Sequence, residues 1–166
     1  MNSIPKKLEK YLHKHRVQYE IIVHPTRYTS DEIAQAEHVP GNQVAKVVML
    51  RCHDKDVMAV FPASHSVDFF NMSTMLGTQD VRMERESEFA KLFPDCEVGA
   101  MPPFGKLYGL PLYCDRSLAK ELEIEFNAGT HTDTIRMEFS EFERLEAPII
   151  LNFSEKFTGK PMARTA

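Results

Sequence analysis

The sequence has few of the features that define specialised structural classes. Its 166 residues include only three cysteines, Cys52, Cys96 and Cys114, with no Cys-x-x-Cys or Cys/His ligand spacing. This pattern argues against a zinc site or a disulfide framework, so we expect three reduced thiols and no metal or other cofactor. No apolar run approaches the roughly 20 residues that span a bilayer, and the N-terminus lacks the apolar segment of a signal peptide. We therefore expect a cytoplasmic protein without a membrane partner.

A large positive charge is also lacking, because the formal net charge is −4. A general nucleic-acid binder makes many phosphate contacts and is usually basic. The charge argues against a DNA partner. A protein that touches only the end of an RNA through a small basic patch remains compatible with it.

Length and composition indicate one globular domain, with 43% hydrophobic and 27% charged residues. We expect this domain to span residues 1–153, followed by a loose polar tail at 154–166. Apolar patterns and turn residues predict helices at 4–16, 29–38, 68–76, 86–93 and 140–145, and strands at 17–23, 44–52, 57–63, 80–84, 112–114, 122–126, 134–139 and 148–153. Strands in the middle with helices at the ends and crossings predict a mixed α/β or α+β protein.

The first predicted helix carries a basic row. Ser3 is a plausible N-cap, and Pro5 suits the first turn. Lys6, Lys10 and Lys14 recur at intervals of four residues and therefore share one face. That row is either a solvated surface or a contact for RNA phosphates.

A charged residue interrupts the most apolar predicted strand. Lys46 shares one strand face with Val48 and Leu50, while the other face is also apolar. A lysine in a central strand needs a partner, unless it lies at the strand end and extends its ammonium to water. The functional alternative is an ammonium at the floor of a cleft, paired with a phosphate or a polarised carbonyl.

The segment Gly99-Ala-Met-Pro-Pro-Phe-Gly105 lies in a long irregular stretch. Pro102 and Pro103 have fixed φ angles and stiffen the chain, while the glycines permit tight turns. The loop is either a rigid surface turn or a frame that presents the amides of Gly99, Ala100 and Met101 to a carbonyl oxygen. An amide used in this way stabilises an oxyanion by about 3–4 kcal/mol.

Two histidines accompany these features. His131 lies in Phe126-Asn-Ala-Gly-Thr-His-Thr-Asp133, where Asn127 and Gly129 are typical turn formers. It is either solvated or part of a site. His24 precedes a proline at a predicted strand end, where it could line a cleft.

Recognisable catalytic motifs are missing: the sequence contains no HExxH, nucleophile elbow, P-loop or dinucleotide fingerprint. Cys96 lies close to the Gly99 loop and is a possible thiol nucleophile, but no base is identifiable for it. A thiol-dependent hydrolase is therefore one alternative.

The strand segment Ala45-Lys46-Val-Val, the loop from Gly99 through Pro103 to Gly105, and Phe126-Asn-Ala-Gly129 occur together and in this order. In combination they resemble the YbaK-type aminoacyl-tRNA editing domain, which is found within or free beside bacterial prolyl-tRNA synthetases. The resemblance covers about residues 4–153. It implies a compact domain with a mixed, mostly antiparallel sheet flanked by helices.

The resemblance also implies an activity and its residues. It implies a metal-independent hydrolase that removes a mischarged small amino acid (alanine, cysteine, serine or threonine) from the acceptor end of tRNA, with transient association with a synthetase. Catalytic roles would fall to Lys46 and the amides of Gly99, Ala100 and Met101. Substrate contacts would come from the residues His24, Pro102, Pro103, Phe104, Asn127, Gly129 and His131. A non-catalytic module that binds an aminoacyl-adenosine through the same cleft is the main alternative.

Overall fold

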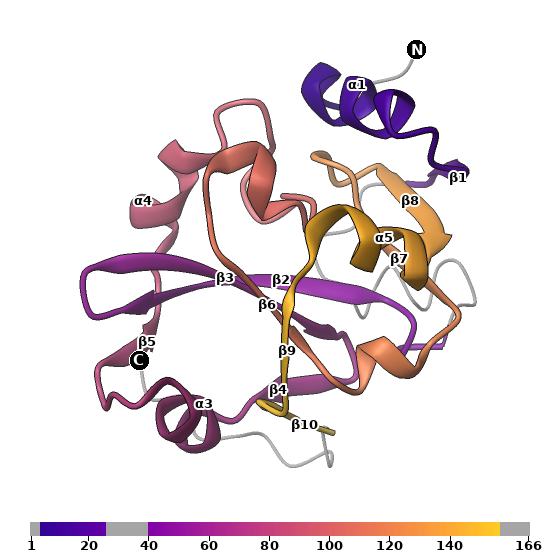
Figure 1. Cartoon of the computed structure of the whole chain (residues 1–166). Coiled ribbons are helices and arrows are strands. Elements are labelled where there is room, and N and C mark those ends of the chain that lie inside the picture. Colours follow the sequence, from indigo (N-terminus) through magenta and orange to yellow (C-terminus); the bar gives the residue numbers. More distant parts are fainter. Residues whose placement is uncertain (1–3, 26–39, 157–166) are drawn as a thin grey trace.

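The computed structural model describes residues 4–25 and 40–156, and three sheets carry most of this structure (Figure 1). The α-helices in these ranges are α1 (Lys6–Lys14), α3 (Phe69–Leu76), α4 (Glu86–Phe89) and α5 (Phe139–Glu146), and the 3₁₀ helices are η1 (Ala90–Leu92), η2 (Gly105–Tyr108) and η3 (Leu118–Lys120). The strands are β1 (Tyr19–Val23), β2 (Ala45–Cys52), β3 (Lys55–Pro62), β4 (His65–Val67), β5 (Val81–Met83), β6 (Leu112–Asp115), β7 (Glu123–Asn127), β8 (Asp133–Glu138), β9 (Ile149–Leu151) and β10 (Ser154–Lys156). None of the helices in the described ranges has the length and apolar character needed to cross a membrane.

The largest sheet has five strands in the order β5-β2-β3-β6-β9. Its centre is the antiparallel hairpin of β2 and β3, which turns at His53 with a φ of 58°. β6 and β9 extend the sheet in parallel beyond β3. Ala45 and Met49 belong to one buried cluster and Val48 and Leu50 to another, so both faces of β2 are covered.

The second sheet has three antiparallel strands in the order β1-β8-β7. It meets the large sheet at one point, a parallel bridge between Val44 and Glu125, where the Glu125 N–H donates to Gln43 O at 3.0 Å. This bridge brings the start of β2 beside β7.

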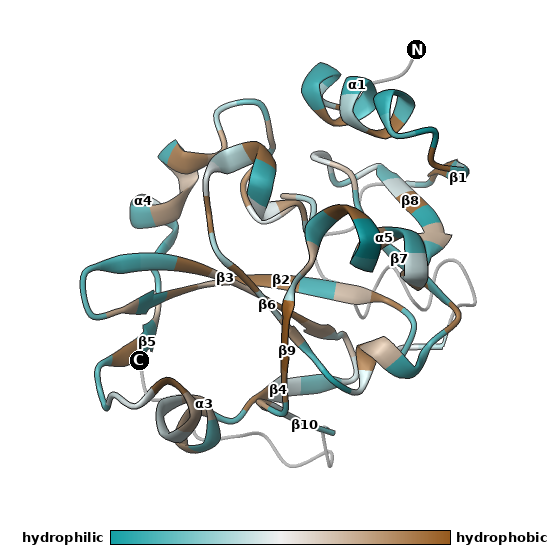
Figure 2. Ribbon diagram, viewed as in Figure 1, coloured by the Kyte–Doolittle hydropathy of each residue, from teal (hydrophilic) through white to brown (hydrophobic). Residues whose placement is uncertain are grey.

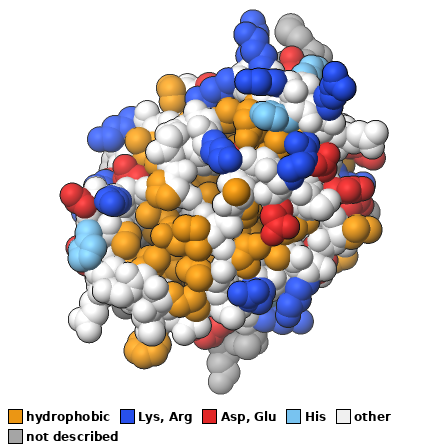
Figure 3. Space-filling model, viewed as in Figure 1, with side chains coloured by type: hydrophobic (Ala, Val, Ile, Leu, Met, Phe, Trp, Pro, Cys, Tyr) orange, Lys and Arg blue, Asp and Glu red, His pale blue; other side chains and the backbone are white. Residues whose placement is uncertain are grey.

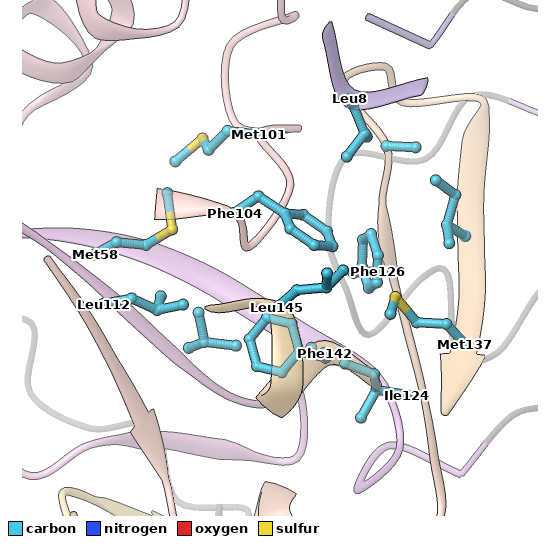
Figure 4. Packing of buried hydrophobic residues seen from close by; sticks show 14 of the residues in the cluster. Leu8, Met58, Met101, Phe104, Leu112, Ile124, Phe126, Met137, Phe142 and Leu145 are labelled. Carbon is cyan, nitrogen blue, oxygen red and sulfur yellow. The ribbon is translucent and has the colours of Figure 1, made fainter. Parts of the chain in front are cut away.

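The main hydrophobic core lies between the two larger sheets and is closed by α1 and α5 (Figure 4). Phe104 lies at its centre, with the rings of Phe126 and Phe142 edge-on at centroid distances of 5.5 and 5.9 Å. From α1, Leu8 and Leu12 enter the same core, and the helix turns its hydrophilic side outward (Figure 2).

Most predicted elements are confirmed, including the β2–β3 hairpin and the mostly antiparallel pairing. The single predicted sheet is divided into three, and the short strand β4, between β3 and α3, was not predicted. The first helix begins at Lys6 with Pro5 at its N-cap position, and the helix at 86–93 is split into α4 and η1. The predicted N-cap Ser3 and helix 29–38 lie outside the described residues.

The predicted polar tail needs a correction at its start. Residues 154–156 form β10, which pairs antiparallel with β4. The buried Asp115 carboxylate accepts the N–H groups of Phe153 and Ser154, both at 2.8 Å. These bonds attach the chain to the end of β6. The polar composition of residues 154–156 gave no indication that they form a strand. The remaining tail residues, 157–166, lie outside the described part.

Candidate functional site

Lys46 is the second residue of β2 and pairs with Phe61 of β3. Its side chain is exposed, and its Nζ lies 5.9 Å from the Phe61 ring centroid. Within residues 4–25 and 40–156 no carboxylate pairs with this ammonium. Of the two alternatives for this lysine, the structure agrees with the one at the strand end whose ammonium reaches water, and not with an ammonium buried at the floor of a cleft. The ammonium is accessible to a ligand.

The bridge between the sheets places Asn127 on the same side as Lys46. Val44 and Glu125 are bridged in parallel, and Lys46 and Asn127 each lie two residues farther along their strands. Because side chains alternate in strands, both point to the side of Val44 and Glu125. Asn127 also forms the last pair of β7 with Thr134 of β8.

The Gly99 loop and the turn after β7 are joined by their backbones. The Glu97 N–H donates to Gly129 O, and the Gly129 N–H donates to Ala100 O, both at 2.8 Å. Gly99 has a φ of +84°, and a Cβ placed on it would lie 3.7 Å from Cε1 of His131. The structure thus brings together two predicted segments that are about 30 residues apart in sequence.

Two of the three predicted amide donors remain available in this loop. The Ala100 N–H donates to Glu97 O at 3.0 Å, and Ala100 is fully buried, so its predicted role as a donor to substrate is wrong. For Gly99 and Met101, the described residues supply no acceptor to the N–H groups. Gly99 is exposed, whereas the Met101 side chain packs in the core. These two amides are the candidates for holding a carbonyl oxygen.

Pro102, Pro103 and Phe104 anchor the Gly99 loop in the interior of the protein. Pro102 and Pro103 are buried, and Phe104 has no exposed surface. The prediction that Phe104 contacts substrate is wrong, because its ring is enclosed by Tyr11, Phe126 and Phe142. The two prolines fix the loop conformation above this ring.

Both histidines are buried, His131 against the start of the Gly99 loop and His24 against the turn after β7. Nε2 of His131 lies 2.8 Å from Val98 O, and Nδ1 of His24 lies 2.7 Å from Pro25 O. A carbonyl oxygen only accepts, so Nε2 of His131 and Nδ1 of His24 carry the protons. The His24 N–H also donates to Thr132 O at 2.9 Å, which brings the end of β1 to the same turn.

Two carboxylates that the sequence reasoning did not assign to the site hold the turn in place. Asp133 is buried and accepts the Thr130 hydroxyl at 2.6 Å, while the Asp133 N–H donates back to Thr130 Oγ1 at 3.0 Å. The His131 N–H points to Glu97 Oε1 at 3.4 Å. The Thr130-x-x-Asp133 spacing was the available signal, since hydroxyl and carboxylate side chains often close local turns.

The basic row lies on the outer face of α1. Lys6, Lys10 and Lys14 are exposed, and Lys and Arg side chains gather on the part of the surface where α1 lies (Figure 3). Lys7 points inward, with Nζ 3.8 Å from the Tyr108 ring centroid and 3.7 Å from Asp95 Oδ2. This contact fixes α1 next to the segment that leads into the Gly99 loop.

Cys96 lies beside Asp95 and Tyr108, and its surroundings do not favour a nucleophilic thiolate. Burial raises the pKa of its thiol to about 12, and Sγ lies 3.3 Å from the Tyr108 hydroxyl oxygen. A thiol protonated at neutral pH lacks the thiolate that attacks esters. The structure therefore argues against a thiol-dependent hydrolase.

Replacing Cys96 by alanine is expected to leave hydrolytic activity within about twofold of the original. Hydrolysis of an aminoacyl ester by the Cys96→Ala protein is the measurement, with thermal unfolding as the folding control. A loss of 100-fold or more in a folded variant would restore the thiol mechanism.

Comparison with known proteins decides the family. Residues 24–145 match the profile of the aminoacyl-tRNA editing domain, which covers most of the chain. The chain belongs to the aminoacyl-tRNA editing domain family. This match spans His24, Lys46, the Gly99 loop and His131, so the segments that the fold brings together are those that the family profile covers.

Individual relatives of this editing-domain chain are distant. The multifunctional Ser/Thr-tRNA deacylase ProXp-y of Escherichia coli strain K12 is 22% identical over 153 residues, covering 89% of this chain and 91% of the relative. The crystal structure of hypothetical protein APE2540 has a TM-score of 0.81 at 18% identity, covering 90% of this chain and 99% of that chain. A candidate trans-editing enzyme for prolyl tRNA synthetase has a TM-score of 0.77 at 20% identity, with coverages of 90% and 96%. These two structures show that the fold is shared.

Proposed function

We propose that this protein is a cytoplasmic trans-editing deacylase, which hydrolyses the ester of a mischarged tRNA that carries alanine, cysteine, serine or threonine. The observation that carries this proposal is the pair of amides, Gly99 and Met101, to which the described residues supply no acceptor, on a loop bonded to the His131 turn. Family membership supports it, as does the relative described as a Ser/Thr-tRNA deacylase.

The substrate itself supplies part of what hydrolysis requires. An ester is already activated relative to an amide, and the terminal adenosine supplies a neighbouring 2′-hydroxyl. The Gly99 and Met101 amides hold the carbonyl oxygen and stabilise the negative charge that develops on it. Lys46 pairs with the terminal phosphate or with the same oxygen. A water molecule attacks the carbonyl carbon, the bond from that carbon to the ribose oxygen breaks, and a proton from the water passes to the leaving ribose oxygen, which releases the free amino acid and the uncharged tRNA. His131 acts as a positioning residue, because its Nε2–H bond to Val98 O holds the loop.

Selection among small amino acids depends on the fit of the side chain. One methylene changes apolar binding by only about 1–3 kcal/mol, so a pocket that excludes large side chains admits several small ones. We expect hydrolysis of at least one of the four small aminoacyl-tRNAs, in transient association with a synthetase, and exclusion of a large amino acid.

A panel of alanyl-, cysteinyl-, seryl- and threonyl-tRNA, with phenylalanyl-tRNA as the large control, tests the function. The expected result is release of a small amino acid at a rate proportional to enzyme and no release of phenylalanine. Binding of the aminoacyl-tRNA with protection of its ester would instead identify a non-catalytic binding module.

The basic row on α1 is proposed to contact the acceptor stem. Charge reversal at Lys6, Lys10 and Lys14 is expected to weaken tRNA binding at low salt and to lower the salt slope by about 2–3, since each phosphate contact contributes about 0.7–0.9. The matched control reverses Lys55, Lys120 and Lys156, three exposed lysines elsewhere. Equal affinity of the two triple variants, measured from 20 to about 200 mM salt, would refute this contact.

A further inference from the structure

Asn127 has a hydrogen-bonding atom to which the described part of the chain supplies no partner. Its Oδ1 is buried, and no donor reaches it from the described residues. A buried amide oxygen without a donor destabilises a folded protein, and such atoms are rare unless a ligand or water completes them. The Oδ1 atom therefore marks a place where a donor is missing.

The two charged residues near Asn127, Glu125 and Lys46, leave Asn127 Oδ1 as the acceptor that a ligand can use. On the same face of β7, Glu125 is already paired with Arg136, whose Nε and Nη2 lie 3.1 and 3.0 Å from Oε1. Lys46 on the adjoining strand is a donor to anions and offers no acceptor. A ligand that reaches both residues would place a negative or polarised oxygen at Lys46 and an N–H or O–H group at Asn127.

We propose that Asn127 Oδ1 accepts a hydrogen bond from the α-amino group of the aminoacyl ester, an inference that rests on the proposed deacylase function. Every aminoacyl ester has this group one carbon from the reacting carbonyl, so it stays within a short distance of the carbonyl wherever the Gly99 and Met101 amides hold that carbonyl. As an ammonium it is also the strongest hydrogen-bond donor of the aminoacyl group. Asn127 thereby separates aminoacyl-tRNA from N-acylated tRNA, whatever the amino-acid side chain.

Binding of non-hydrolysable analogues tests the inference without requiring catalysis. The probes are 3′-amino-3′-deoxyadenosine acylated with serine, with N-acetylserine, with 3-hydroxypropanoic acid and with alanine, titrated by calorimetry. The intact protein is expected to bind the serine analogue at least tenfold more tightly than the N-acetyl and desamino analogues. In Asn127→Ala this preference is expected to fall below threefold, and in Asn127→Asp it returns because an acceptor is restored.

Other outcomes separate the possible failures. An unchanged preference in Asn127→Ala would overturn the inference while leaving the deacylase function standing. A loss confined to the serine analogue, with the alanine analogue unaffected, would assign Asn127 to the side-chain hydroxyl and also overturn it. Asn71→Ala on α3 is the control for replacing an asparagine elsewhere, and its preference should equal that of the intact protein. Failure of the aminoacyl-tRNA panel with a retained preference would reject catalysis alone.

Discussion

Replacing Lys46 by alanine is expected to lower kcat/KM for deacylation by about 100-fold or more, the loss seen when a donor to the developing oxyanion is removed. The fold should persist, because the Lys46 side chain is exposed and pairs with no carboxylate within the described ranges. Steady-state hydrolysis of the best substrate from the tRNA panel, over a range of substrate concentrations, is the measurement, with thermal unfolding of the same sample.

The kinetics also decide what Lys46 contacts. A fall in kcat at unchanged KM means that the ammonium acts on the charge that develops at the carbonyl oxygen, whereas a rise in KM alone means that it binds the terminal phosphate equally in the ground and transition states. Lys55→Ala is the matched control, because it removes an exposed lysine from the other strand of the same hairpin. If the Lys46→Ala protein were as active as the Lys55→Ala protein, Lys46 would have no role in the mechanism.

The local patterns of the sequence predicted the framework of the site well. The β2–β3 hairpin follows from two apolar strands around His53-Asp54, and Gly99 does adopt the positive φ that glycine allows. Such features are decided by neighbouring residues, so the sequence alone contains enough information to predict them.

The errors concern contacts between distant segments. Lys46 shares its strand face with Val48 and Leu50, and nothing in the sequence shows that β7 meets the chain at Val44, just before β2, and leaves Lys46 exposed on that face. Likewise, whether the Ala100 amide faces a ligand depends on the turn closed by Glu97 O. The parallel bridge was also needed to show that Asn127 and Lys46 lie on the same side. A strand pattern predicts which residues share a face, but it does not predict which other segment packs against that face.

Replacing Gly129 by alanine is expected to destabilise the fold strongly. Gly129 has a φ of +91°, and a Cβ there would lie 2.5 and 2.6 Å from Cδ and Cγ of Pro5. The backbone strain and the overlap with the proline ring should together cost about 3–5 kcal/mol. Equilibrium urea unfolding measures this loss. Activity should fall as well, since the Gly129 N–H and C=O both bond to the Gly99 loop.

Gly77 supplies the control that separates the two costs. Its φ is +70°, but a Cβ there would have no neighbour within 4 Å, so Gly77→Ala should show the backbone term alone, about 1–2 kcal/mol. In the Gly129→Ala background, Pro5→Ala removes Cδ and Cγ of the ring and should recover the steric part of the loss, which a double-mutant cycle resolves as a coupling energy. If Gly129→Ala costs no more than Gly77→Ala, or if the cycle shows no coupling, α1 is not held against the turn by Pro5. The position of α1, and of its basic row, would then depend on other contacts, including the core contacts of Leu8 and Leu12 and the Lys7 contact.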